Sequence, residues 1–295
     1  MLVFSGSSNR LLAGRLAKSL KTRVGEMELS RFANDEVRVW VKEKQVGRRA
    51  VLLQSLSRPV DTHLVEFALI SDALKRKGIK EIIAVIPWLG YTKQDKVFRA
   101  GEPLSAEVVA KMLQVVPLKR VIVYDLHNLT VRKFFDVPVK NLSGRKLFRE
   151  YFANKIDKET ILVAVDAGAA ESSARFGKDL GIEVAYINKR RDLNNGRVTI
   201  KGISKNVKGK KVLIKDDMIA TGSTLVEAAK FLKKQAVQSV EVAATHHLYV
   251  PGAQKKIDKS PIDSLLVTDT VEPREKSRKL RVISVADKLA EEIGD

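Results

Sequence analysis

Two adjacent carboxylates followed by a small polar turn form the most informative group of residues in this chain. An apolar run at residues 212–214 leads into Asp216 and Asp217. The turn that follows precedes a helical pattern and consists of Ala220, Thr221, Gly222, Ser223 and Thr224. The N–H groups of such a turn and of the helix N-terminus can bind a phosphate. The carboxylates would repel a second phosphate but accept hydrogen bonds from hydroxyl groups. The group therefore predicts a sugar-phosphate site; metal ligands or a solvated turn are the alternatives.

Basic residues gather in two other segments. Lys93, Lys96 and Arg99 recur at helix-like spacing after a strand pattern, so one face could meet a triphosphate. A basic surface loop is the alternative. The run from Lys189 to Arg191 follows the predicted strand 183–188 and leads into a strong turn signal at 192–196. Three cations on a flexible loop could close over a transferring phosphoryl group, and an exposed basic hairpin is the alternative.

His127 and Asp166 each end a predicted strand, where α/β proteins usually bind ligands. His127 could ligate a metal, contact a phosphate or satisfy a loop carbonyl. The small residues after Asp166 permit close approach of the backbone to a ligand. One imidazole and one carboxylate, completed by phosphate oxygens, suit magnesium better than a site built from protein ligands alone. We expect His246 and His247 to be core or loop residues and assign no role to His63.

Short apolar strands alternate with helical patterns along the whole chain, which predicts an α/β fold with a mainly parallel sheet. The predicted strands are residues 50–54, 81–87, 120–126, 161–166, 183–188, 211–215, 240–245, 264–268 and 280–283, and residues 1–6 are predicted to be a strand that runs into a turn. The predicted helices are residues 10–20, 60–77, 105–115, 144–155, 171–180, 225–235 and 286–293.

The two halves of the chain look like copies of one unit. The run 51–53 is followed by 64–66 at the same spacing that separates 212–214 from 225–227. This duplication, for which chance similarity is the alternative, predicts domains at residues 1–143 and 144–295. The first copy has Ser55 and Leu56 where the second has Asp216 and Asp217. We therefore expect the first copy to have lost the sugar site.

Composition excludes several classes of protein. The 295 residues contain no cysteine, which rules out disulfides and thiolate chemistry, and no apolar run approaches the length of a membrane span. We therefore expect a soluble protein of the cytoplasm with no membrane contact. The net charge of +19 is spread along the chain and interleaved with acids. This pattern favours a solvated surface, or steering of anionic substrates, over a nucleic-acid-binding protein.

Taken together, these segments resemble the ribose-phosphate diphosphokinase family over nearly the whole chain. Any one motif is weakly specific, but seven in the family's order are specific. They are residues 32–36, 90–95, 125–127, 166–168, 189–191, 216–217 and 268–270. The resemblance implies two tandem phosphoribosyltransferase-like domains. It also implies transfer of the diphosphoryl group of ATP to ribose 5-phosphate, with Mg²⁺ as cofactor. The implied assembly is at least a homodimer, and a hexamer is an alternative.

The resemblance also implies a role for each matched position. Lys189 and Arg191 would be catalytic. The sugar phosphate would be bound by Asp216, Asp217 and the turn Ala220, Thr221, Gly222, Ser223 and Thr224. ATP would be bound by Phe32, Asn34, Glu36, Lys93, Gln94, Lys96 and His127, the first three reaching adenine of a neighbouring subunit. His127 and Asp166 would hold the metal.

The chain departs from the family pattern at several of these positions. Ala220 stands where many members have an acid, and Ser223 replaces a glycine or alanine. Lys93 and Lys96 stand at positions that are usually arginine, and Asn34-Asp35 replaces the usual Asp-Gly. Two rival functions remain: a salvage phosphoribosyltransferase, and a non-catalytic regulatory or nucleic-acid-binding paralogue.

Overall fold

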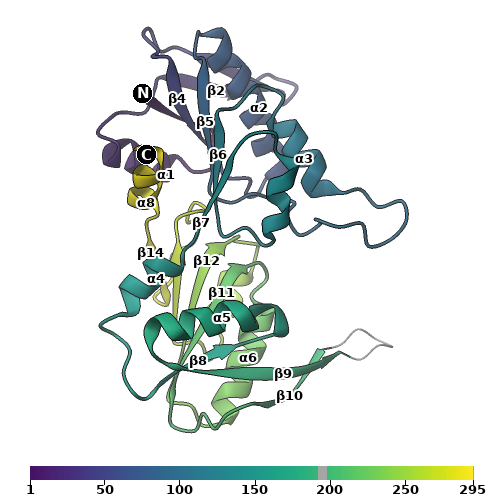
Figure 1. The fold of residues 1–295 in the computed structure, drawn as a ribbon, viewed down its shortest axis with the longest axis vertical. Coiled ribbons are helices and arrows are strands. Elements are labelled where there is room, and N and C mark those ends of the chain that lie inside the picture. The colour runs from purple at the N-terminus through teal and green to yellow at the C-terminus, as the bar shows by residue number, and fades with distance from the viewer. Residues whose placement is uncertain (192–197, 295) are drawn as a thin grey trace. The chain divides into compact units, whose positions relative to one another are not determined.

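The computed structural model describes residues 1–191 and 198–294, which divide into two compact units (Figure 1). Unit 1 contains Met1–Ser143 and two returning segments, Asp269–Glu272 and Ser284–Asp295. Unit 2 contains Gly144–Thr268 and Pro273–Ile283. The predicted domains, residues 1–143 and 144–295, place both returning segments in the second domain. The division into these two domains stays a prediction.

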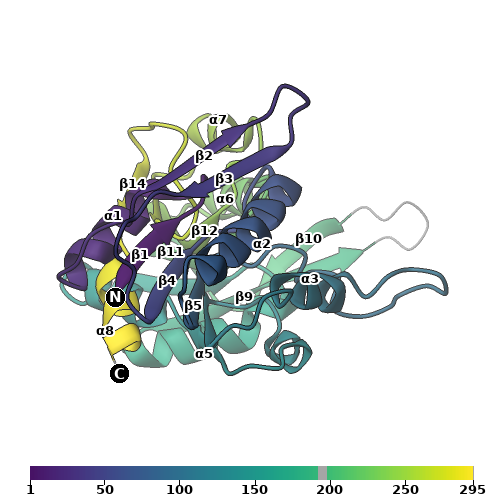
Figure 2. The same cartoon turned by 90° about the horizontal axis from the view of Figure 1, so that it is seen from above.

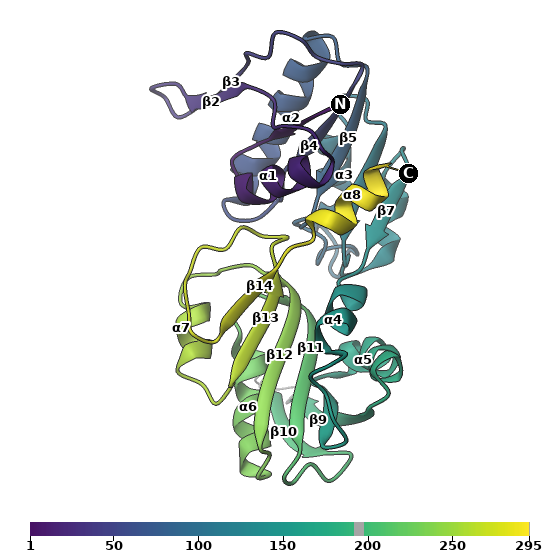
Figure 3. The same cartoon turned by 90° about the vertical axis from the view of Figure 1, so that its left-hand side faces the viewer.

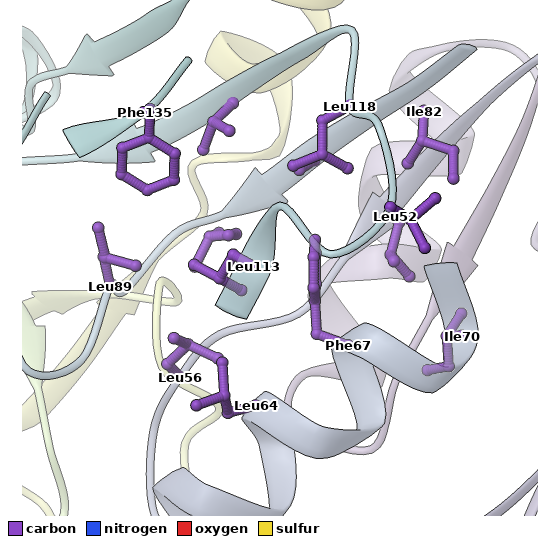
Figure 4. Packing of buried hydrophobic residues seen from close by; sticks show 14 of the residues in the cluster. Leu52, Leu56, Leu64, Phe67, Ile70, Ile82, Leu89, Leu113, Leu118 and Phe135 are labelled. Atoms are coloured by element: carbon purple, nitrogen blue, oxygen red, sulfur yellow. The ribbon is translucent and has the colours of Figure 1, made fainter. Parts of the chain in front are cut away.

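Unit 1 is built on a five-stranded sheet in which every neighbouring pair of strands is parallel. Its order is β1 (Leu2–Ser5), β4 (Arg49–Leu53), β5 (Glu81–Ile86), β6 (Arg120–Tyr124) and β7 (Val139–Leu142). The helices are α1 (Arg10–Ser19), α2 (Val60–Arg76), α3 (Ser105–Leu113) and α8 (Ala286–Gly294), with a 3-10 helix at Leu129–Phe134. The buried core includes Leu52 on β4, Phe67 and Ile70 on α2 and Leu113 on α3 (Figure 4).

Unit 2 is built on a seven-stranded sheet. Its order is β10 (Val198–Ile203), β9 (Glu183–Arg191), β8 (Thr160–Ala164), β11 (Lys211–Ile219), β12 (Ser239–His247), β13 (Ser264–Thr268) and β14 (Leu280–Ile283). Only β10 runs antiparallel to its neighbour among these described strands. The helices are α4 (Arg145–Phe152), α5 (Ala167–Leu180), α6 (Ser223–Lys234) and α7 (Ala253–Asp258).

The α/β class with mainly parallel sheets is confirmed, and the sequence explains why. The central strands are rich in Val, Ile and Leu, which suits strands buried on both faces, as in Ile161–Val163 and Val212–Ile214. Helices α1, α2, α3, α6 and α8 lie within two residues of their predicted bounds. Four short strands, β2 (Met27–Arg31), β3 (Val37–Val41), β7 and β10, were not predicted.

The two units share one strand order, which agrees with the predicted duplication. The parallel order β1-β4-β5-β6-β7 of unit 1 corresponds to β8-β11-β12-β13-β14 of unit 2. Each copy also inserts a hairpin between its first and second core strands. In unit 1 this is β2–β3, a separate two-stranded sheet that projects away from the five-stranded sheet in Figure 3. In unit 2 it is β9–β10, seen in Figure 2.

The C-terminal helix α8 packs against α1 within unit 1. Ser19 Oγ on α1 donates a hydrogen bond of 2.6 Å to Asp287, and Arg120 donates to the carbonyl of Glu292 at 2.9 Å. Asp269 secures the other returning segment, because its carboxylate accepts hydrogen bonds from Arg15 at 2.7 Å and from the backbone of Val285 at 2.8 Å. Within residues 1–191 and 198–294, no helix combines the length and apolarity needed to span a bilayer.

Candidate active site

Asp216 and Asp217 lie within a strand and not after its end. The sequence predicted a strand ending at Lys215, but β11 continues to Ile219. The extension follows from its neighbour: β12 runs in parallel as far as His247, and the ladder pairs Asp216 with Ala244 and Ile219 with His247. The two carboxylates are therefore held by a hydrogen-bonded backbone, which limits their motion.

The carboxyl group of Asp216 has a strongly perturbed pKa. This pKa is raised to about 7, first by burial and then by a side-chain hydrogen bond with Asp217 and the negative charges of Asp217 and Asp166, against a hydrogen bond from the backbone N–H of Asp217. That N–H lies 2.8 Å from Asp216 Oδ1. The carboxyl ends of β8 and β11 thus form a region of negative potential. Hydroxyl donors or a cation would stabilise it.

The predicted phosphate turn connects β11 to α6. Gly222 has φ +70° and ψ 0°, a left-handed conformation that favours glycine, and it is the N-cap residue of α6. The helix begins at Ser223, two residues earlier than predicted. The hydroxyl groups of Thr221 and Ser223 lie 3.3 Å apart at its N-terminus. The turn therefore combines two hydroxyl groups with the N–H groups of the first helical turn, which suits an anion.

Asp166 caps the N-terminus of α5. Its side chain accepts a hydrogen bond from the N–H of Ala169 at 2.9 Å, and the helix starts at Ala167. The sequence predicted a turn at 166–169 and a helix only from 171. The capping side chain explains the difference, because an N-cap Asp satisfies an N–H of the first turn and lets the helix start directly after it. A Cβ at Gly168 would lie 3.4 Å from Asp166 Oδ1, an ordinary van der Waals distance, so the fold itself does not require glycine there.

Lys189 lies in a strand of a two-stranded ribbon. The predicted loop starting at residue 189 is wrong for residues 189–191, because β9 extends to Arg191 and pairs with β10. Lys189 pairs with Ile200 in this ladder. An exposed basic hairpin was the alternative for this segment, and its described strands pair as antiparallel neighbours. The side chain of Arg191 and the turn signal at 192–196 lie outside the described residues.

In unit 1, one hydrogen bond joins two of the predicted ATP segments. Asn128, which directly follows His127, donates from its side-chain amide to the carboxylate of Asp95. Gln94 is held by its side chain, which accepts a hydrogen bond from Ser105 Oγ, and by its carbonyl, which accepts one from the N–H of Ala106 at 3.2 Å. The segment carrying Lys93, Gln94 and Lys96 is therefore anchored beside the turn that carries His127. Lys93 and Lys96 themselves are exposed.

The residues predicted to meet adenine lie at the tip of the β2–β3 hairpin. The N–H of Phe32 donates to the carbonyl of Glu36 at 2.9 Å, and Asp35 adopts φ +68° in the turn between them. The ring of Phe32 is 52% exposed and has the Arg38 guanidinium 5.8 Å from its centre. An exposed aromatic face beside a guanidinium can stack on a flat heterocycle.

The carboxyl end of β4, which corresponds to the end of β11, is filled by side chains of unit 1. The carboxylate of Glu66 accepts hydrogen bonds from the N–H and hydroxyl of Ser7 at 3.0 and 2.8 Å and from Gln54 at 2.8 Å. Ser8 Oγ donates to Gln54 at 2.7 Å and accepts from the N–H of Ser55. These groups satisfy one another, which agrees with the prediction that the first copy lost its sugar site. Glu66 gave no sequence signal, because it lies in an ordinary helical pattern.

The structure groups the predicted residues within each unit. Unit 2 brings together Asp166, Asp216, Asp217 and the turn at 220–224, and unit 1 brings together residues 93–96 and His127. Among the described residues, no group of three or more His, Cys, Asp or Glu side chains could hold a metal ion. His127 and Asp166 belong to different units. The prediction that His246 and His247 are core or loop residues is confirmed, since both are fully buried.

Comparisons with known proteins cover nearly the whole chain. Residues 1–116 match the N-terminal domain of ribose phosphate pyrophosphokinase, and residues 139–274 match the phosphoribosyl transferase domain. Proteins named ribose-phosphate pyrophosphokinase from Helicobacter hepaticus and Thermotoga maritima are each 35% identical, with 99% of this chain and 94% of the relative covered. The crystal structure of phosphoribosylpyrophosphate synthetase from Mycobacterium smegmatis has a TM-score of 0.91 at 32% identity, covering 99% and 97% of the two chains.

Proposed function

The chain belongs to the ribose-phosphate pyrophosphokinase family, and from that premise we propose its reaction, the residues that perform it and its assembly. The protein transfers the diphosphoryl group of ATP to the 1-hydroxyl of ribose 5-phosphate and produces phosphoribosyl pyrophosphate and AMP. The observation that carries this proposal is the Asp216–Asp217 pair beside the glycine turn that starts α6, inside a full-length family match.

The reaction forms one bond and breaks one. The oxygen of the sugar 1-hydroxyl attacks the β-phosphorus of ATP, the bond from that phosphorus to the α,β-bridging oxygen breaks, and AMP leaves with this oxygen. The hydroxyl proton is released. Little covalent chemistry is required of the protein, so positioning and stabilisation of charge must supply most of the rate.

Each group of residues has one task in this proposal. Asp216 and Asp217 accept hydrogen bonds from the ribose hydroxyls, and the turn at 220–224 binds the 5-phosphate. Phe32, Asn34 and Glu36 contact adenine of a neighbouring subunit, while Lys93, Gln94, Lys96 and His127 bind ATP. Lys189 and Arg191 stabilise charge on the transferring group and on the departing AMP.

Magnesium is the proposed cofactor, and the donor set fits it in part. Asp166 and His127 would hold it, and the neighbouring carboxyl groups of Asp166, Asp216 and Asp217 favour a cation at this end of the sheet. The described side chains form no complete ligand set, so phosphate oxygens of ATP would supply the remaining ligands. When bound, the ion neutralises phosphate charge.

A homo-oligomer of at least two subunits and a location in the cytoplasm belong to the same proposal. The salvage rival uses the same sugar loop but consumes phosphoribosyl pyrophosphate. It is disfavoured by the family match of residues 1–116, because that match is to a domain named for the pyrophosphokinase.

The test is formation of AMP from ATP and ribose 5-phosphate, with and without magnesium and with no nucleobase present. We expect AMP that requires both the sugar phosphate and the metal. A protein that makes no AMP but converts phosphoribosyl pyrophosphate and a base into a nucleotide would be the salvage enzyme. A protein inactive in both assays, with salt-dependent RNA or DNA binding, would be a paralogue without catalysis.

A further inference from the structure

Helix α7 lies next to the phosphate turn of unit 2, and nothing in its sequence predicted a role there. It packs beside α6, as Figure 3 shows. A Cβ on Gly222 would lie 3.2 Å from two side-chain carbons of Ile257 and 3.8 Å from the carbonyl of Ala253. The turn therefore rests on α7, and residues of this helix are neighbours of whatever the turn binds.

The positively charged ammonium group of Lys256, on α7, contacts the phosphate turn at residues 220–224. Its Nζ donates a hydrogen bond of 2.8 Å to Ser223 Oγ, which lies 3.3 Å from Thr221 Oγ1. Within residues 1–191 and 198–294, no carboxylate forms an ion pair with Lys256. An ammonium group at a helix N-terminus is unfavourable by itself, because this end of the helix already carries positive potential. The arrangement becomes favourable when an anion binds between the Lys256 ammonium group and the N-terminus of α6.

Buried hydrogen bonds fix the position of α7. The ring nitrogen Nδ1 of His247 accepts from the N–H of Tyr249 at 2.9 Å, so Nε2 carries the proton and donates to Gln254 Oε1 at 3.1 Å. Gln254 then donates to Asp258 at 2.8 Å, and Ser277 donates to the same carboxylate at 2.6 Å. His247 and Gln254 are almost fully buried. Lys256 is thus presented from a helix attached to the end of β12.

We propose that Lys256 is a binding residue for the phosphomonoester group of the sugar phosphate. The ammonium has three donors, so it can keep its hydrogen bond to Ser223 and donate another to a phosphate oxygen. Because Ser223 Oγ accepts from Lys256, its own proton is available for the phosphate. Ser223, which departs from the family pattern, therefore accepts a hydrogen bond from Lys256 and donates one to the phosphate. This proposal rests on the proposed function, since it adds a residue to the same sugar-phosphate site.

The experiment compares Lys256→Met, which keeps the aliphatic stem, with Lys256→Arg and with Lys255→Met. Lys255 is the exposed neighbour on the same helix and provides a control with the same loss of charge. We expect Lys256→Met to raise the KM for ribose 5-phosphate about tenfold, with a smaller change in kcat and none in the KM for ATP. Lys256→Arg should retain most of the affinity, and Lys255→Met should match the wild type.

Calorimetry with ribose 5-phosphate alone separates this proposal from the proposed function. If the wild type binds the sugar phosphate and Lys256→Met binds it about tenfold more weakly, the inference stands even where no AMP is formed. If AMP is formed but Lys256→Met and Lys255→Met have equal affinities, the inference is wrong and the function holds. A wild type that binds no ribose 5-phosphate overturns both. Parallel weakening of ATP and sugar binding would indicate a structural role for Lys256 and overturn the inference.

Discussion

In the protein without a bound ligand, ionisation of Asp216 costs free energy of folding. An acid whose pKa rises from 3.8 to about 7 on folding makes the folded state less stable above that range, since the unfolded chain gives up its proton more readily. Ribose hydroxyls that donate to this group would offset part of that cost on binding. The raised pKa of Asp216 thus supports the proposed sugar site, because strongly shifted pKa values cluster at functional sites.

At the residue scale, we predict that Asp217→Ala weakens binding of ribose 5-phosphate about thirtyfold. The loss of hydrogen bonds to a charged acceptor typically costs about 2 kcal/mol, which corresponds to this factor. ATP affinity should change little. Glu227→Ala on the exposed side of α6 is the control, because it removes the same charge outside the turn. Calorimetric titration of both variants decides the matter, and unaltered sugar affinity in Asp217→Ala would refute the assignment.

His247 predicts a pH dependence of stability. Burial lowers its pKa to about 4, below the ordinary 6.5, so the folded protein holds it neutral while the unfolded chain takes up a proton. Its contribution is therefore full above pH 6.5 and is lost as the pH falls towards 4. At pH 4.5 the loss should be about 2–3 kcal/mol.

The measurement is urea unfolding of the wild type and of His247→Gln at pH 7.5 and pH 4.5. The variant lacks the titrating ring, so its unfolding free energy should fall less on acidification by about that amount. Equal falls in the two proteins would show that His247 does not titrate as its burial implies.

At the scale of elements, the two units carry equivalent hairpins to which we assign different roles. Each inserts a hairpin between the first and second core strands. The hairpin of unit 1 carries Phe32, Asn34 and Glu36 at its tip, and that of unit 2 carries Lys189. In the proposed mechanism, function therefore lies on equivalent insertions, and the parallel core is the same in both units. This is the usual division between scaffold and site.

We predict that Lys189→Ala lowers kcat about a thousandfold and leaves affinity for ribose 5-phosphate nearly unchanged, since a well-placed cation acts mainly on the charge of the transition state. Lys201→Ala is the matched control, because Lys201 is an exposed lysine on the partner strand β10. Steady-state kinetics with both substrates gives the result. Turnover that matches the control variant would remove Lys189 from the mechanism.

The phosphate turn allows a second test at this scale, with Gly222→Ala compared with Gly209→Ala. Both glycines have positive φ, +70° and +74°, so both substitutions should cost about 1 kcal/mol of stability. Only at Gly222 would the new Cβ also meet Ile257, at 3.2 Å, whereas Gly209 has open space. We therefore expect only Gly222→Ala to weaken sugar-phosphate binding as well. Equal sugar affinities in the two variants would separate the turn from the site.

The sequence was most informative where one physical requirement dominated. Buried parallel strands need apolar β-branched residues, so these strands and the main helices were predictable. The extension of β11 to Ile219 was not, because it depends on the length of β12, which lies distant in sequence. The position of Lys189 depended in the same way on pairing with β10. Lys256 and Glu66 gave no local signal at all, since their significance comes only from the tertiary neighbours Ser223 and Ser7.

At the scale of the whole molecule, exposed apolar side chains are distributed unevenly. Among the described residues, the large hydrophobic side chains that are exposed all belong to the first 129 positions, and they include Trp40 at 54% and Val115 at 66% exposure. Unit 2 shows none of this size within its described part. We propose that unit 1, which carries this apolar surface, makes the contacts with another chain. A second copy is the simplest partner, in agreement with the proposed homo-oligomer.

We predict that the protein sediments as a dimer or a larger assembly at micromolar concentration. Val115→Glu should shift this equilibrium towards the monomer, because it places a charge on the exposed apolar surface near the end of α3. Gln238→Glu, an equal change of charge at an exposed position of unit 2, should leave the sedimentation unchanged. If adenine is bound between subunits, activity should fall with dissociation. A fully active wild-type monomer would therefore contradict both the assembly and the shared adenine site.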